Sequence, residues 1–328
     1  MPHPSFMEKV LHDPVLSAFE LPLRRTFYPY GFPLELETNS GDVIAAASEG
    51  WGAFGPLFDE PPVRLSLGVL EGSGGPLPLE PVIRSREHMM MTVLDPENFV
   101  ICDFNAGFAF GWVTQCTAAD HPFLRYRVLT GAGAPLVEQR AFAVMHGALV
   151  ARNGKGLMLA GDTFAGKSTL AYACARTGWT YVTDDGAMMV RGRDDRYTVG
   201  DPHSIRFRPD APELFPELAG HLAAVRPNGK IAIEILTREL ELDTAPGCHV
   251  DYIVHLNRKR GYRAHLRHLS KERMLDEWSQ YNVFGTQKVQ EQRRRCHERM
   301  LGAQLLEMQY SDLTEAVACL EHLVDKGA

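Results

Sequence analysis

The sequence predicts an α/β domain from about residue 141 onward, preceded by a β-rich region over residues 1–140. Two nearly continuous apolar runs, at 141–150 and 156–161, are typical of strands buried on both faces of a sheet. A strand, a loop, a helix and a second strand then follow within about 30 residues, which indicates a βαβ unit. Before residue 141, frequent prolines and short alternating segments favour strands and turns over long helices.

The composition is that of a folded globular protein. The chain has 328 residues, of which 45% are hydrophobic and 23% charged, so there is enough apolar material for a sizeable core. Its 34 basic and 41 acidic side chains give a net charge of −7, which disfavours nucleic acid as a partner. The widely spaced cysteines, the lack of a secretory signal and the lack of a long uncharged apolar run predict a soluble cytoplasmic protein without a membrane partner.

Three segments carry the expectation of a β-rich amino-terminal region. Alternation from Val63 onward predicts a strand, and residues 89–104 predict a hairpin around the turn-forming segment 95–98. Residues 124–129 also alternate and predict a further strand. We therefore expect two domains, at residues 1–140 and 141–328, the second ending in helical additions.

The most specific motif lies between a predicted strand and a predicted helix, and it fits G-x-x-x-x-G-K-[ST]. It reads Gly161-Asp162-Thr163-Phe164-Ala165-Gly166-Lys167-Ser168 and is followed by Thr169. Backbone N–H groups and the positive end of a helix can surround phosphates in such a loop. Lys167 would neutralise phosphate charge, and Ser168 would offer a hard oxygen ligand to Mg²⁺. The alternative is a chance match in a strand-to-helix turn.

Phe164 stands where many such loops have glycine, so its side chain is expected to point away from a nucleotide. Asp184 and Asp185 follow Lys167 by 17 and 18 residues, at the end of the next predicted strand. Ligands bind at this carboxyl edge of an α/β sheet. One carboxylate could hold Mg²⁺ and the other could accept a proton from an attacking hydroxyl. The alternative is an ordinary surface turn.

Taken together, residues 141–260 resemble the catalytic domain of the bacterial HPr kinase/phosphorylase family, which is related in fold to phosphoenolpyruvate carboxykinase. The resemblance rests on His146-Gly147, on the phosphate loop, and on Thr183-Asp184-Asp185. The spacings of 21 residues from His146 to Lys167 and of 18 residues from Lys167 to Asp185 agree with the family pattern. A weaker similarity to the family's Pro-Gly-Arg-Asn loop and its following strand covers residues 226–234.

The resemblance implies a P-loop kinase domain that uses ATP and Mg²⁺ to phosphorylate a serine hydroxyl on a protein or peptide, or a small-molecule hydroxyl. It implies that Asp185 is the general base, that Lys167 holds the transferred phosphoryl group and that His146 assists at the phosphate site. Ser168 and Asp184 would hold the metal. Because the family forms rings, a homo-oligomer is compatible with it.

The sequence departs from the family at two places. Phe164 is one, and the other is the missing Glu-Ile-Arg-Gly-Leu-Gly signature, whose glutamate ligates metal in the family; the nearest segment is His203–Arg208. Arg206, Arg208 and Lys230 are candidates to contact phosphate, because guanidinium and ammonium groups suit its oxygens.

Three functions remain open from the sequence: a kinase, an NTPase or phosphorylase using water or phosphate as acceptor, and a non-catalytic nucleotide-binding regulator. Two basic runs, at 258–267 and 293–295, could bind nucleic acid or an acidic protein, but such runs are usually solvated faces. Sparse aromatic residues and the negative net charge disfavour RNA.

Overall fold

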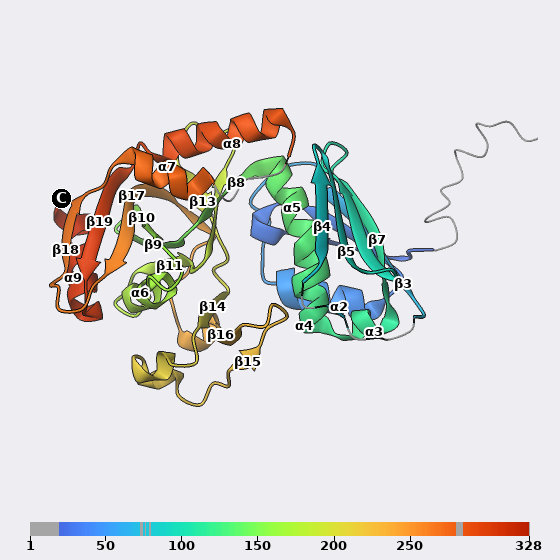
Figure 1. The fold of residues 1–328 in the computed structure, drawn as a ribbon, viewed down its shortest axis with the longest axis horizontal. Helices are drawn as coiled ribbons and strands as arrows, with labels where there is room; N and C mark the ends of the chain where they lie inside the picture. Colours follow the sequence, from blue (N-terminus) through green and yellow to red (C-terminus); the bar gives the residue numbers. More distant parts are fainter. Residues whose placement is uncertain (1–19, 73–74, 76, 79, 280–284, 328) are drawn as a thin grey trace, which may run out of the picture. The chain divides into compact units, whose positions relative to one another are not determined.

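The computed structural model describes residues 20–72, 75, 77–78, 80–279 and 285–327. The protein is mixed α/β and divides into two compact units, unit 1 (Met1–Val137) and unit 2 (Glu138–Ala328) (Figure 1). In the described ranges, every helix is too short or too polar to cross a lipid bilayer.

Unit 1 contains a seven-stranded sheet. Its strands are β1 (Leu23–Phe27), β2 (Leu34–Thr38), β3 (Val63–Leu70), β4 (Val82–Arg86), β5 (Met89–Asp95), β6 (Asn98–Asp103) and β7 (Phe108–Thr114). They lie in the order β1-β2-β3-β7-β6-β5-β4, with β2, β3 and β7 mutually parallel and the other neighbours antiparallel. The hairpin predicted over residues 89–104 is confirmed by the antiparallel pairing of β5 with β6.

Helices accompany this sheet. They are α2 (Gly41–Trp51), α3 (Gln115–Ala119), α4 (His121–Phe123), a π-helix (Leu124–Leu129) and α5 (Thr130–Ala141), with a 3-10 turn at Pro29–Gly31. The helix α2 forms in a proline-free stretch, and the Ser40 hydroxyl accepts the N–H of Asp42 at its start.

The strand predicted over residues 124–129 is wrong, because this segment is helical. The side chains that it buries are those of Leu124, Val128 and Leu129. These positions share one side of a helix, whereas strict alternation would have selected residue 126 in place of 129. Packing within the unit therefore decides against the local alternation of the sequence.

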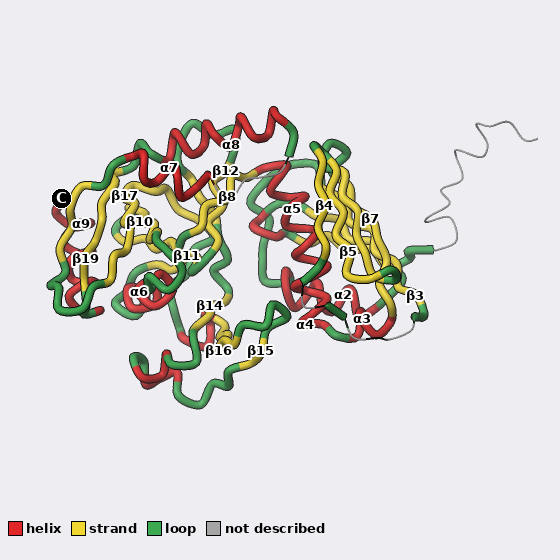
Figure 2. The backbone as a smooth tube through the Cα atoms, viewed as in Figure 1, coloured by secondary structure: helices red, strands yellow, loops and turns green. Residues whose placement is uncertain are grey.

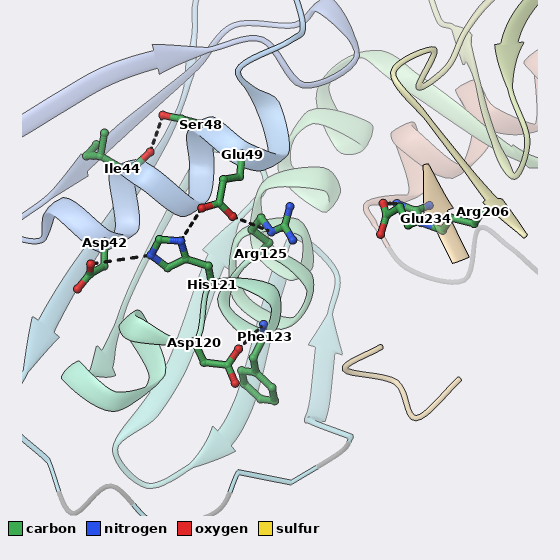
Figure 3. A network of polar contacts seen from close by, with 10 residues as sticks. All are labelled: Asp42, Ile44, Ser48, Glu49, Asp120, His121, Phe123, Arg125, Arg206 and Glu234. Atoms are coloured by element: carbon green, nitrogen blue, oxygen red, sulfur yellow. Dashed lines mark hydrogen bonds and ion pairs between the residues drawn. The ribbon is translucent and has the colours of Figure 1, made fainter. Parts of the chain in front are cut away.

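A polar network joins α2 to the helical segment that begins at α4 (Figure 3). The Nδ1 atom of His121 lies 2.6 Å from a carboxylate oxygen of Glu49, and its Nε2 lies 3.8 Å from Asp42. The guanidinium of Arg125 lies 3.6 Å from the other oxygen of Glu49. These contacts fix the two helices against each other.

Unit 2 is built around nine strands. They are β8 (Phe142–His146), β9 (Ala148–Arg152), β10 (Lys155–Ala160), β11 (Thr180–Thr183), β12 (Gly186–Val190), β13 (Tyr197–Val199), β17 (Gly247–Arg258), β18 (His265–His268) and β19 (Gln304–Tyr310). The long strand β17 pairs in parallel with β10 and β19, and antiparallel with β13. The strands β10 and β11 are both antiparallel to β9, which lies between them, so they run in the same direction.

The apolar run at 141–150, which is typical of buried strands, contains parts of two. Gly147 interrupts it, so that β8 pairs with β12 whereas β9 pairs with β10 and β11. A Cβ atom on Gly147 would lie 2.9 Å from the carbonyl oxygen of Leu159, so the chain approaches its neighbour closely at this point.

Two helical layers cover the faces of this sheet (Figures 1 and 2). The helices α6 (Lys167–Ala175) and α9 (Leu313–Lys326) bury Leu170 and Leu320 in one core. The helices α7 (Lys271–Ser279) and α8 (Gln287–Met300) bury Trp278 and Met300 in the other. Complete burial of an apolar side chain such as leucine or methionine stabilises the fold by about 1.5–3 kcal/mol. The helices cover the faces of the sheet, and loops follow the carboxyl ends of β10 and β17.

A small antiparallel sheet completes unit 2. Its strands are β14 (Ser204–Phe207), β15 (Ala224–Val225) and β16 (Ile231–Leu236), in the order β14-β16-β15, with 3-10 turns at Ala211–Glu213, Pro216–Leu218 and Thr237–Leu240.

Candidate functional site

The loop 161–166 connects β10 to α6, and its path depends on two glycines. Gly161 has a φ of +138° and Gly166, the N-cap residue of α6, has a φ of +97°. Side chains of L residues rarely tolerate such angles. A Cβ atom on Gly166 would also lie 2.8 Å from the hydroxyl oxygen of Tyr310, and this hydroxyl donates to the carbonyl of Ala165 at 3.1 Å. Tyr310 of β19 therefore holds the loop in place.

Lys167 is the first residue of α6, and its side chain is buried. Its ammonium group donates to the carbonyl oxygens of Gly161 at 2.7 Å and of Asp162 at 3.2 Å. The positive charge consequently lies against the loop, at the helix end whose backbone dipole is also positive. This arrangement favours a bound anion.

Phe164 occupies the tip of the loop with a φ of +72°, and 77% of its surface is exposed. The guanidinium of Arg208 lies 5.1 Å from the centre of its ring. A left-handed conformation at a residue with a Cβ atom costs about 1–2 kcal/mol. The strained backbone places the ring in solvent beneath Arg208, where it makes a cation–π contact.

Ser168 and Asp184 lie side by side although they come from different elements. The hydroxyl of Ser168 donates to the carbonyl oxygen of Asp184 at 3.4 Å, and a carboxylate oxygen of Asp184 accepts the N–H of Arg206 at 3.2 Å. Burial raises the pKa of Asp184 to about 6, against the opposing effect of the Arg206 charge. The carboxyl group is therefore mostly ionised at neutral pH.

Asp185 has the opposite environment, because 62% of its side chain is exposed. Its carboxylate lies 3.2 Å from Nδ1 of His146. The pairing of β8 with β12 brings the two residues together: His146 is opposite Gly186, and the N–H of Gly147 donates to the carbonyl of Asp185 at 2.9 Å. The two neighbouring carboxylates thus differ: that of Asp184 is buried and accepts the N–H of Arg206, and that of Asp185 is exposed beside His146.

Arg206, from β14, lies among several carboxylates. Its guanidinium donates to Glu234 at 3.2 Å across the β14–β16 pair (Figure 3). Burial by itself lowers the pKa of Arg206, but the negative charges of Glu234, Asp184, Asp201 and then Asp185 outweigh burial and raise it. Arg206 is consequently a fixed positive charge that partly neutralises the acidic side of the site.

The hydroxyl of Ser168 and the buried carboxylate of Asp184 are the oxygen ligands that Mg²⁺ prefers, with the remaining positions left to water and phosphate. The hydroxyl of Ser168 bonds to the main-chain carbonyl of Asp184, so the two residues lie at one place in the fold, and their residue types suit such an ion. In the described part of the chain, no cluster of three or more histidine, cysteine, aspartate or glutamate residues could enclose a metal by itself.

The remaining predicted phosphate contacts are distributed differently. Arg208 lies over Phe164 at the loop, whereas Lys230 is exposed in the turn between β15 and β16, where its N–H bonds to Asn228. Thr169 is half-buried in the first turn of α6.

The sequence did not single out Tyr310 or Asp201. Tyr310 holds the loop from 145 positions away, and no local pattern marks it. Asp201 accepts the N–H of His203 at 3.0 Å, and burial raises its pKa.

Comparisons with known proteins give a distant similarity. No family model and no curated protein matches the chain. A solved structure of the Hpr(Ser) kinase/phosphatase from Coxiella burnetii is similar over 56% of this chain and 99% of that chain, with 13% sequence identity and a TM-score of 0.29. At this level the similarity establishes neither family membership nor activity.

Proposed function

We propose that unit 2 is a magnesium-dependent phosphotransferase, which binds ATP at the loop 161–168 and transfers its γ-phosphoryl group to a hydroxyl, with a serine of a protein or peptide as the leading acceptor. One observation carries this proposal. At the start of α6 the ammonium of Lys167 lies against the loop, and the hydroxyl of Ser168 donates to the main-chain carbonyl of Asp184. The side chain of Asp184 is buried, whereas that of the next residue, Asp185, is exposed. Phosphoryl transfer needs positioning and charge stabilisation of this kind rather than covalent chemistry by the protein.

The loop would bind the donor. The first-turn N–H groups of α6 and the ammonium of Lys167 would contact the β- and γ-phosphates, exchanging the carbonyl contacts of Lys167 for phosphate oxygens. Ser168 and Asp184 would hold the metal ion, which when bound neutralises charge on the triphosphate.

Asp185 would act as the general base. Its exposed carboxylate would accept the proton of the acceptor hydroxyl while the hydroxyl oxygen bonds to the γ-phosphorus and the bond from that phosphorus to the β-bridging oxygen breaks. His146, 3.2 Å from the carboxylate, would orient Asp185. ADP and the phosphorylated acceptor are the products.

Hydrolysis or phosphorolysis is the second candidate. The observation that favours it is the 62% exposure of Asp185, since water or inorganic phosphate can reach this carboxylate as readily as a hydroxyl side chain. The same residues would then serve as an NTPase or a phosphorylase.

The test follows the γ-phosphate. We would incubate the full-length protein with Mg²⁺, ATP labelled at the γ-phosphate and a degenerate serine-containing peptide library, and compare it with the Asp185→Asn variant. Label on peptide supports the kinase, and label only in free phosphate supports hydrolysis. The variant should bind a fluorescent ATP analogue normally and lose roughly 10²–10⁴-fold in turnover.

Two results would overturn the proposal. If ATP binds but all label stays in triphosphate, the protein is a nucleotide-binding regulator. If Asp185→Asn transfers label at the wild-type rate, the assignment of the base is wrong.

A further inference from the structure

A basic segment that the proposed chemistry does not use surrounds β18. Residues 258–268 contain no acidic side chain, although the chain as a whole has a net charge of −7. Their cationic residues are Arg258, Lys259, Arg260, Arg263 and Arg267, all exposed, joined by His265 and His268. So much positive charge in one short segment of an acidic protein needs an explanation beyond solubility.

The strand β18 presents a free edge. In the described residues it pairs with β19 alone. The N–H of Leu269, just beyond β18, donates to the carbonyl oxygen of Leu305. In an antiparallel pair, every second residue directs its N–H to the partner strand. The N–H groups of Leu266 and His268 therefore point away from β19. The N–H of Ala264, on the same outward side, already bonds to a carboxylate, that of Glu315 at 3.2 Å.

A groove of about 840 Å³ is lined by residues of β18, β19 and α9. Figure 1 shows these three elements side by side at the carboxyl-terminal end of the chain. Leu266, Leu306 and Leu323 contribute apolar surface to it. Arg263 and Arg267 contribute positive charge to it, with Arg267 also 2.7 Å from Glu307, and Glu315, His268 and His322 complete its polar lining. The groove therefore combines backbone donors and acceptors, apolar contacts and positive charge.

We propose that this groove binds an acidic polypeptide segment in extended conformation, which adds as a strand to the free edge of β18. Main-chain hydrogen bonds to the edge would supply affinity. In a strand, successive side chains point to opposite sides, so apolar residues can face Leu266 and Leu323 on the side of α9. A carboxylate at the end of the added segment would lie near Arg263. The length of β18 suits a segment of roughly four to six residues.

Nucleic acid fits this surface less well. The basic segment contains one aromatic residue, Tyr262, which leaves few platforms for base stacking. An exposed strand edge with apolar surface alongside it suits a peptide backbone rather than a phosphodiester. The phosphate loop 161–166 does not line the groove, so the proposal stands apart from the proposed catalysis.

Binding would be measured by fluorescence anisotropy with labelled hexapeptides. The probes are the acidic peptide Glu-Val-Glu-Val-Glu-Val, its counterpart with lysine in place of glutamate, and a single-stranded oligonucleotide. Two further acidic peptides carry N-methyl groups at alternate residues, one along each hydrogen-bonding edge of the peptide. The acidic peptide should bind, and at least one methylated version should lose binding about tenfold or more, because an N-methyl group blocks strand addition on that edge.

The matched variants are the double change Arg263→Glu with His322→Glu, and the double change Arg238→Glu with His221→Glu as a charge-matched control outside the groove. The double change should weaken the acidic peptide about tenfold or more, and the control should leave binding unchanged.

Four results would overturn the proposal: equal binding of acidic and lysine peptides, unchanged binding of both methylated peptides, tighter binding of the oligonucleotide, or unchanged binding after the double substitution. Because none of these measurements uses ATP, they do not depend on the outcome of the transfer assay.

Discussion

The substitution Asp184→Asn should stabilise the protein at neutral pH while removing its metal-dependent chemistry. Asp184 is only 5% exposed, and its burial raises the pKa to about 6 from an ordinary value of 3.8. The folded protein therefore holds a proton on this group more tightly than the unfolded chain does. Asparagine keeps the shape of the side chain without the charge whose burial is unfavourable.

The magnitude follows from this change in pKa. A rise from 3.8 to about 6 corresponds to about 3 kcal/mol. Below pH 3.8 the Asp184 carboxyl is protonated in both the folded and the unfolded protein, and the wild type has about 3 kcal/mol of additional stability. The wild type loses this contribution as the pH rises through about 6. Relative to wild type, Asp184→Asn should thus be near neutral at pH 4 and more stable by up to about 3 kcal/mol at pH 8.

Urea unfolding followed by circular dichroism between pH 4 and 8 measures this difference directly. Asp194→Asn, at an exposed aspartate, is the matched control and should give a difference near zero at every pH. A stability difference for Asp184→Asn that does not grow with pH, or that has the opposite sign, would show that burial does not dominate the energetics of this carboxyl.

Three further predictions concern the loop and the sheet beside it. Lys167→Ala should abolish binding of a fluorescent ATP analogue, because the buried ammonium is the principal positive side chain against the loop; normal binding contradicts this role. Gly166→Ala should destabilise the protein by more than Gly154→Ala in urea unfolding, since both need positive φ but only the first Cβ would meet Tyr310, at 2.8 Å; equal losses would exclude this contact as the cause. Glu307 of β19 accepts hydrogen bonds from Asn257 at 2.7 Å, Arg267 at 2.7 Å and Gln309 at 3.1 Å. Glu307→Gln should cost roughly 1–3 kcal/mol at pH 7. Burial raises the pKa of Glu307, but its hydrogen bonds outweigh burial and lower the pKa below 4.5. The cost of Glu307→Gln should therefore shrink as the pH falls below 4.5. A cost that does not change with pH would contradict this prediction.

Local patterns were reliable where the structure depends on neighbours in sequence. The hairpin over residues 89–104 formed as its turn residues indicated, and the glycines of the phosphate loop take the positive φ angles that only glycine adopts easily. The alternation at 124–129 failed, since burial against the rest of unit 1 favours a helix there.

The site itself shows the same division. The sequence alone determined a glycine-bounded loop between a buried strand and a helix, followed by two aspartates, because the conformations involved are set by residues within a few positions of each other. Only the tertiary structure decided that the carboxylate of Asp184 is buried and that of Asp185 exposed beside His146, and that Arg206 and Tyr310 reach the same region. These contacts arise from strand order and sheet pairing, and burial and charge depend on groups brought together across the fold rather than along the chain.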